Sequence, residues 1–167
     1  MDTSVAIVGY MGSGKTTLGR HLARALRLEF VDLDRAIAKS AGKGIPEIFA
    51  QHGEKHFRDL EHKALVRALD GETPSVVACG GGTVVRADNR TLLRDVTTVF
   101  LREDTDVLYQ RTRGPGRPLR GASRKEFGLR YAKRLPLYRE VADIEIEADR
   151  RPLEEVAEEV LACLSRR

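Results

Sequence analysis

The sequence predicts an α/β domain built around a mainly parallel sheet, and three observations support this fold class. Short apolar runs alternate along the chain with longer segments in which apolar residues recur at helical spacing. A complete Gly-x-x-x-x-Gly-Lys-Thr string, residues 9–16, directly follows the first apolar run and precedes a helical pattern. The length of 167 residues suits one domain of ordinary size. We therefore expect residues 1–167 to form a single domain.

The expected elements follow in order along the chain. Strands are predicted at residues 5–8, 29–31, 76–79, 97–101 and 144–146, and the apolar run at 76–79 indicates a buried strand. Helices are predicted over residues 15–26, 34–41, 46–51, 54–69, 105–112 and 153–164.

Turn and capping residues support several of these boundaries. Pro46 stands in the first turn of its helix, where a missing N–H costs nothing. Gly71 and Pro74 end the long helical stretch before the third strand. Ser123 and Glu126 have the spacing of a capping box, which predicts a further helix from this point. The apolar residues from Leu153 to Leu164 form one stripe, so the last helix should pack on the sheet.

Composition points to a cytoplasmic protein with small anionic ligands. The chain is 41% hydrophobic and 32% charged, and it has neither a membrane-length apolar stretch nor the pattern of a signal peptide. Its two cysteines, Cys79 and Cys163, suit reduced core thiols. The net charge is +4, but the arginines gather between Arg111 and Arg139 and only 5% of residues are aromatic. We therefore expect no nucleic-acid partner, no membrane and a monomer.

The glycine-rich string at residues 9–16 predicts a site for a nucleotide polyphosphate. Glycines allow backbone N–H groups to point inward, Lys15 can reach the β- and γ-phosphates, and the Thr16 hydroxyl can bind Mg²⁺. Asp32 and Asp34 follow the second strand, at the sheet edge where α/β proteins bind ligands. One carboxylate can hold Mg²⁺ through water and the other can accept a proton from an attacking hydroxyl, although either can also cap the next helix.

Three further patterns concern the binding of a second ligand and the closure of the site. Arg58 and Glu61 are spaced to pair on one helix face, which would orient the arginine toward a carboxylate or phosphate. The triplet at residues 80–82 follows a buried strand, so its backbone can approach a ligand closely. Residues 114–121 are rich in glycine and proline and are interpreted as part of a mobile lid that excludes water, with a plain surface loop as the alternative.

Taken together, these residues resemble the shikimate kinase family over nearly the whole chain. The resemblance depends on the following motifs: residues 9–16, Asp32-Leu33-Asp34, residues 44–49, Gly53-Glu54, Phe57-Arg58 with Glu61, Gly80-Gly81-Gly82, Arg117-Pro118-Leu119 and residues 130–138. It implies a three-layer P-loop kinase domain with a five-stranded parallel sheet, a substrate-binding region at about 34–61 and a lid at about 112–124. It also implies transfer of the γ-phosphate of ATP to the 3-hydroxyl of shikimate, in aromatic amino-acid biosynthesis.

The resemblance assigns roles by position. Lys15, Asp34 and Arg117 would act in catalysis, and Thr16 with Asp32 would hold Mg²⁺. Shikimate would be bound by Asp34, Arg58, Gly80, Gly81, Gly82 and Arg134. The nucleotide would be bound by Gly12, Ser13, Gly14, Lys15, Thr16, Thr17, Arg111, Arg117, Arg151 and Pro152.

Other functions share part of this pattern. A nucleoside monophosphate kinase shares the loop, lid and size, but paired aspartates and isolated arginines fit a hydroxylated carboxylate better than a second nucleotide. A gluconate kinase is the closer alternative, because its acceptor is also a polyhydroxy acid. A nucleotide-dependent switch or a non-catalytic binding module is a third. Against a GTPase, the chain has no Asn-Lys-x-Asp string, and against a motor ATPase, its third strand ends in Cys79 where an acidic residue is usual.

Overall fold

A computed structural model describes residues 3–113 and 123–166 and contains a five-stranded, fully parallel sheet. The strand order is β2-β3-β1-β4-β5. The strands are β1 (Val5–Val8), β2 (Glu29–Asp32), β3 (Ser75–Ala78), β4 (Thr97–Arg102) and β5 (Ile144–Glu147). Each lies within a residue or two of its expected position, which confirms the α/β fold class.

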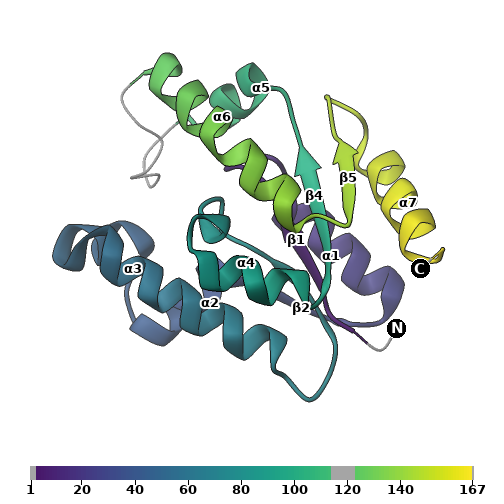
Figure 1. Cartoon of the computed structure of the whole chain (residues 1–167), viewed down its shortest axis with the longest axis horizontal. Helices are drawn as coiled ribbons and strands as arrows, with labels where there is room; N and C mark the ends of the chain where they lie inside the picture. Colours follow the sequence, from purple (N-terminus) through teal and green to yellow (C-terminus); the bar gives the residue numbers. More distant parts are fainter. Residues whose placement is uncertain (1–2, 114–122, 167) are drawn as a thin grey trace.

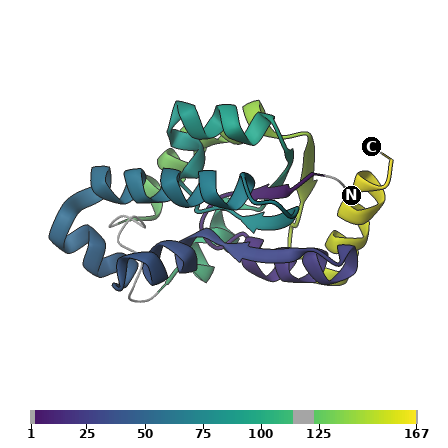
Figure 2. The same ribbon diagram turned by 90° about the horizontal axis from the view of Figure 1, so that it is seen from below.

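Helices cover both faces of the sheet (Figures 1 and 2). The helices are α1 (Lys15–Leu26), α2 (Leu33–Ala41), α3 (Ile45–Leu69), α4 (Ala87–Arg94), α5 (Thr105–Arg111), α6 (Arg124–Val141) and α7 (Leu153–Leu164), with a 3₁₀ turn, η1 (Thr83–Val85). None of the helices in the described parts of the chain has the length and apolar character needed to cross a membrane.

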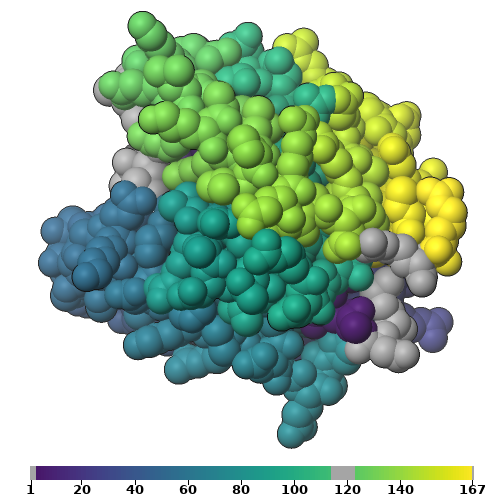
Figure 3. Space-filling model, in the orientation of Figure 1, coloured from purple at the N-terminus to yellow at the C-terminus, as the bar shows by residue number. Residues whose placement is uncertain are grey.

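Alternating side chains of β1 divide the core into two layers. Val5 and Ile7 pack with residues of α1 and α7 on one face of the sheet. Ala6 and Val8 pack with residues of α3, α4 and α6 on the other face. Figure 3 shows α6 and α4 lying next to each other over this second face. This two-sided burial explains why the inner strands β1 and β3 are mostly apolar, whereas the edge strand β5 alternates buried and exposed residues.

The helix α3 is bent at Gly53, which has φ 77° and ψ 178°. The two helices expected over 46–51 and 54–69 are therefore the two arms of α3, separated by this non-helical residue. A small third core, formed by Ile37, Ile48 and Phe57, joins the arms to α2. The bend turns the outer arm back toward α2, on the side of the sheet's carboxyl edge (Figure 2).

The helix α4 was not among the expected elements. It is eight residues long, its N-terminus has no side-chain cap, and most of its residues are polar. Leu93 and Asn89 are its buried side chains, and Asn89 donates a hydrogen bond to the carbonyl oxygen of Thr83 at 2.9 Å. Contacts with distant residues stabilise this helix, so local sequence patterns do not reveal it.

Other local predictions are confirmed. The Ser123 hydroxyl accepts a hydrogen bond from the Glu126 N–H at 3.2 Å and caps α6. Both cysteines are free thiols; Cys79 is buried and Cys163 is half-buried against the core. The carboxyl ends of the strands meet at one edge of the sheet, where the glycine-rich string follows β1, Asp32 ends β2 and Gly80 lies just beyond β3. Chain topology thus brings the predicted donor and acceptor residues to the same edge.

Candidate active site

The segment between β1 and α1 forms a cradle whose shape requires glycine. Gly12 and Gly14 have φ values of 83° and 95°, in the left-handed region. A Cβ at Gly9 would lie 2.6 Å from the carbonyl oxygen of Leu101, which is backbone and has no freedom to move away. The Nζ of Lys15 donates a hydrogen bond to the carbonyl oxygen of Tyr10 at 2.9 Å. The loop therefore holds its lysine through its own backbone, with open space beside it for a phosphate.

Asp32 joins the end of β2 to this cradle. Its Oδ2 accepts a hydrogen bond from the Thr16 hydroxyl at 2.8 Å, and its Oδ1 accepts one from the Arg35 N–H at 3.2 Å. The capping interpretation of Asp32 is therefore confirmed, and its second carboxylate oxygen lies beside the loop threonine. The hydroxyl and carboxylate oxygens present the hard ligands that Mg²⁺ prefers.

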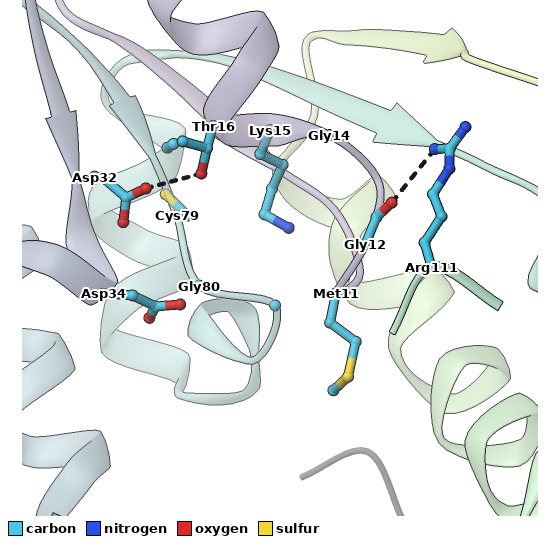
Figure 4. A pocket seen from close by; sticks show the side chains of 12 residues that line it. Met11, Gly12, Gly14, Lys15, Thr16, Asp32, Asp34, Cys79, Gly80 and Arg111 are labelled. Carbon is cyan, nitrogen blue, oxygen red and sulfur yellow. Dashed lines mark hydrogen bonds between the residues drawn. The ribbon is translucent and has the colours of Figure 1, made fainter. Parts of the chain in front are cut away.

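A cavity of about 380 Å³ connects this cradle to the acceptor residues (Figure 4). Asp34, in the first turn of α2, faces it together with Lys15 and Thr16. The remaining lining residues are Met11, Gly12, Gly14, Asp32, Ala78, Cys79, Gly80, Gly81 and Arg111. Burial raises the pKa of the Cys79 thiol, so this thiol stays protonated and is a poor nucleophile.

Arg58 is fixed beside the cavity by a buried partner. Its guanidinium lies 2.7 Å from a carboxylate oxygen of Glu61, which is 1% exposed, and 3.3 Å from Glu54. The other oxygen of Glu61 accepts a hydrogen bond from the Thr83 hydroxyl at 2.9 Å. Burial raises the pKa of Glu61, and the positive charge of Arg58 offsets only part of that effect. The predicted pairing of Arg58 with Glu61 is confirmed. Because both side chains are largely buried, this is not a solvated surface ion pair.

The glycine triplet leaves room for the Arg58–Glu61 pair beside the backbone. At Gly80, a Cβ would lie 2.6 Å from a carboxylate oxygen of Glu61, and at Gly82 it would collide with the Arg58 guanidinium. Arg134 donates to the carbonyl oxygen of Gly81 at 3.2 Å, and the Tyr138 hydroxyl donates to the same oxygen. A side chain at Gly80 or Gly82 would displace Glu61 or Arg58, so the triplet is more than a turn.

Arg134 comes from α6 and is buried. Only 8% of its surface is exposed. Its guanidinium carbon lies 5.3 Å from the centre of the Tyr10 ring, a cation–π distance. Tyr10 is fully buried, stacks on Tyr131 and meets Phe127 edge-on. The residue next to Gly9 in the loop thus carries a ring that packs against Arg134.

A second cavity, of about 180 Å³, lies beyond the loop in the direction of β5 and α7. Four residues of the predicted nucleotide site, Ser13, Thr17, Arg111 and Arg151, line it together with Gly14, Leu18, Leu101, Glu103, Ala148, Leu153 and Val156. Pro152 precedes α7 as its N-cap residue and does not line this cavity. Asp149 and Arg150, just before it, adopt left-handed φ values of 30° and 62°.

Sequence reasoning overlooked several residues that shape the site, and it placed one prediction outside the described residues. Arg117 and most of the predicted lid at about 112–124 fall in the interval 114–122, which the structure does not describe. Tyr10 was passed over because it is a variable position of the glycine-rich string. Glu103 could have been found as an acidic residue just beyond the fourth strand, at the same sheet edge as Asp32. Tyr138 lies in the motif at 130–138, but its bond to Gly81 depends on tertiary packing.

Comparison with known proteins agrees with this geometry. The family model described as shikimate kinase matches residues 11–165. The chain is 42% identical to a shikimate kinase of Nitrobacter winogradskyi over 98% of this chain and 78% of the relative. It is 36% identical to one of Dictyoglomus turgidum over 98% of both chains.

Solved structures give the same result. A shikimate kinase from Acinetobacter baumannii in complex with shikimate superposes with a TM-score of 0.93 and 36% identity, covering 99% of this chain and 94% of that one. A gluconokinase from Sinorhizobium meliloti superposes with a TM-score of 0.63 at 21% identity, covering 99% of this chain and 93% of that one, which indicates a shared fold alone. The sequence matches and the superposition on the Acinetobacter enzyme lead to one conclusion: this chain belongs to the shikimate kinase family.

Proposed function

We propose that this protein transfers the γ-phosphoryl group of ATP to the 3-hydroxyl of shikimate, as a step of aromatic amino-acid biosynthesis. The observation that carries the proposal is the single cavity in which the loop at 9–16, Asp34 and the glycine triplet face one another. The Arg58 guanidinium lies beside Gly82, and Arg134 donates to the carbonyl oxygen of Gly81. Two arginine forks at this triplet favour an anionic acceptor next to the phosphate donor.

On the donor side, backbone N–H groups of Gly12, Ser13 and Gly14 hold the phosphates. Lys15 exchanges its bond to the Tyr10 carbonyl for the β- and γ-phosphates and stabilises charge on the transferring group. Thr17, Arg111, Arg151 and Pro152 surround the nucleoside. The second cavity, with apolar walls and arginines at its rim, supports this placement of the base.

The oxygens of Thr16 and Asp32 fit a magnesium ion, the Asp32 carboxylate acting through water. They are already 2.8 Å apart and face the cavity, and Mg²⁺ is usually held by few protein oxygens together with waters and phosphates. When bound, Mg²⁺ neutralises charge on the β- and γ-phosphates.

On the acceptor side, Arg58 and Arg134 bind the shikimate carboxylate, and the triplet at 80–82 lets the ring approach the backbone. Asp34 accepts the hydrogen bond of the 3-hydroxyl and takes its proton. The hydroxyl oxygen then forms a bond to the γ-phosphorus as the bond to the ADP oxygen breaks. Burial of the acceptor away from water favours this transfer over hydrolysis.

The same proposal includes the domain plan and the lid. Residues 1–167 form one catalytic domain, in which about 34–61 bind the acceptor and about 112–124 close over the nucleotide. Arg117 then contributes positive charge at the transferring phosphoryl group, as an arginine finger does. A monomer suffices, because the donor and acceptor residues all belong to one chain.

An assay of ADP release with shikimate, gluconate, CMP and water as alternative acceptors tests the proposal. We expect turnover with shikimate alone, and phosphorus NMR of the product should locate the phosphate on the 3-hydroxyl. Turnover with gluconate or CMP and none with shikimate would overturn the assignment. Hydrolysis of ATP without any acceptor preference would instead favour a nucleotide-dependent switch.

A further inference from the structure

Glu103 is a buried carboxylate that has no part in the reaction described above. It follows β4, is 2% exposed and lines the smaller cavity beside the loop. Its Oε1 accepts a hydrogen bond from the Asp104 N–H at 3.0 Å. Its Oε2 lies 3.1 Å from the Arg111 guanidinium and receives no hydrogen bond from any described residue. A buried carboxylate is costly unless a cation compensates it, and Arg111 is the cation in contact.

The contacts of Glu103 make it a rigid anchor. Its carboxylate touches the residue that caps α5, Asp104, and the residue that ends the same helix, Arg111. Its carbonyl oxygen accepts a hydrogen bond from the Tyr131 hydroxyl of α6 at 3.2 Å. The position of this carboxylate is therefore defined by a strand end and by two helices.

Arg111, by contrast, depends on its partners for a defined position. Its side chain is 44% exposed. It donates to the carbonyl oxygen of Gly12 at 3.4 Å and lines both the larger and the smaller cavity (Figure 4). A long, half-exposed side chain loses rotamer freedom when a ligand fixes it, unless the protein has already done so.

We infer that Glu103 is a positioning residue, which holds Arg111 between the two cavities and thereby sets the affinity for the donor nucleotide. This inference rests on the proposed function, in which Arg111 contacts the nucleoside. With the carboxylate charge removed, the nucleotide itself has to order the arginine. Nucleotide binding should then weaken, while the chemical step and acceptor binding stay as they are.

The test compares Glu103→Gln with the wild-type protein over its full length. We expect the dissociation constant of ADP, measured by calorimetry, and the KM for ATP to rise about fivefold or more, with kcat and the KM for shikimate changed less than about twofold. Glu145→Gln is the matched control, because it also removes a carboxylate paired with an arginine but lies outside both cavities. ADP binding needs no acceptor, so a wild-type protein that fails to phosphorylate shikimate would be recognised separately.

A double-mutant cycle with Arg111→Met separates positioning from a general structural role. We expect Glu103→Gln to have no further effect on the ADP dissociation constant once Arg111 is replaced. An undiminished effect in the Arg111→Met background, or unchanged ADP affinity in a folded Glu103→Gln protein, would overturn the inference.

If Glu103→Gln does not fold, Glu103→Asp replaces it in the same test, because it keeps the charge and withdraws it by one methylene. We expect Glu103→Asp to reduce ADP affinity in a way that depends on Arg111, and wild-type affinity in this variant would contradict the inference.

Discussion

The donor and acceptor halves of the site are built in opposite ways. The phosphate-binding part of the donor half is one contiguous segment, residues 9–16, in which Lys15 is held by the carbonyl of Tyr10 and Gly9, Gly12 and Gly14 have positive φ values. The acceptor half joins distant segments through side chains, as in the bond between Arg134 and Gly81, which are 53 positions apart. In the proposed function, backbone shape therefore governs phosphate binding, whereas the side-chain contacts of Arg58 and Arg134 govern acceptor binding.

This difference has a consequence for pH and for mutation. Among the described acceptor residues, Arg58 depends on the charge of Glu61, whose pKa burial raises. The backbone of the phosphate cradle has no titratable group of its own. We therefore expect perturbations of the acceptor half to change the KM for shikimate and perturbations of Lys15 to change turnover. Four predictions, in order of decreasing effect, test this division.

The largest effect is expected for Lys15→Ala. Loss of a cation that stabilises charge in the transition state should lower kcat by about 10²- to 10³-fold, with little change in the KM for shikimate. Coupled measurement of ADP release gives both constants. Lys43→Ala is the control, since that lysine bonds Gln51 on the surface and lies outside the cavity. A kcat within about tenfold of the wild-type value would contradict a role in the chemical step.

The next effect is expected for Arg134→Ala. Truncating one member of a buried charge pair costs about 2–5 kcal/mol, so the KM for shikimate should rise by at least about 30-fold while the KM for ATP stays constant. Arg134→Lys should recover only part of the loss, because a lysine lacks the bidentate fork. Arg139→Ala, on the same helix but paired with Glu145, should leave both constants unchanged. An unchanged KM for shikimate in Arg134→Ala would remove this arginine from the acceptor site.

An intermediate effect is expected when the charge of Glu61 is lost through acidification or through Glu61→Gln. Because its pKa is raised, Glu61 takes up a proton at a higher pH than an ordinary glutamate, and Arg58 then loses its partner. The KM for shikimate should rise as the pH falls through this range, and in Glu61→Gln it should be high throughout and lack this step. The free energy of unfolding should change with pH in the opposite direction to shikimate affinity. A group whose pKa is raised in the folded state contributes its full stability in acid and loses that contribution as the pH rises. Urea unfolding at several pH values should show that decline in the wild type and not in Glu61→Gln.

The smallest effect is expected at Tyr10, where the two halves touch. Tyr10→Leu removes the cation–π contact with Arg134, worth about 1 kcal/mol, so the KM for shikimate should rise about fivefold. Tyr10→Phe keeps the ring and should keep the KM. Phe127→Leu removes a ring that packs edge-on against Tyr10, so it should lower stability without changing the KM. Equal KM changes in Tyr10→Leu and Phe127→Leu would mean that packing alone is responsible.

Features that depend on neighbouring residues were predictable from the sequence, and features that depend on contacts between distant segments were not. The strands, the bend region of α3 and the phosphate loop were predictable, because each depends on residues adjacent in the chain. The Arg58–Glu61 pair was predictable for the same reason, since helix geometry brings residues three positions apart together. The helix α4 was not, because Asn89 and Leu93 are stabilised by tertiary contacts.

The sequence alone is sufficient to predict the succession of the strands and of every helix except α4, the phosphate loop and a set of charged residues suited to binding an acid. It does not show which of these residues meet across the fold. The pairing order β2-β3-β1-β4-β5 sets Asp32, Gly80 and Glu103 at one edge, and the packing of α6 brings Arg134 over Tyr10. Helix and turn signals act over a few residues, whereas contacts between distant segments form only after those segments have packed.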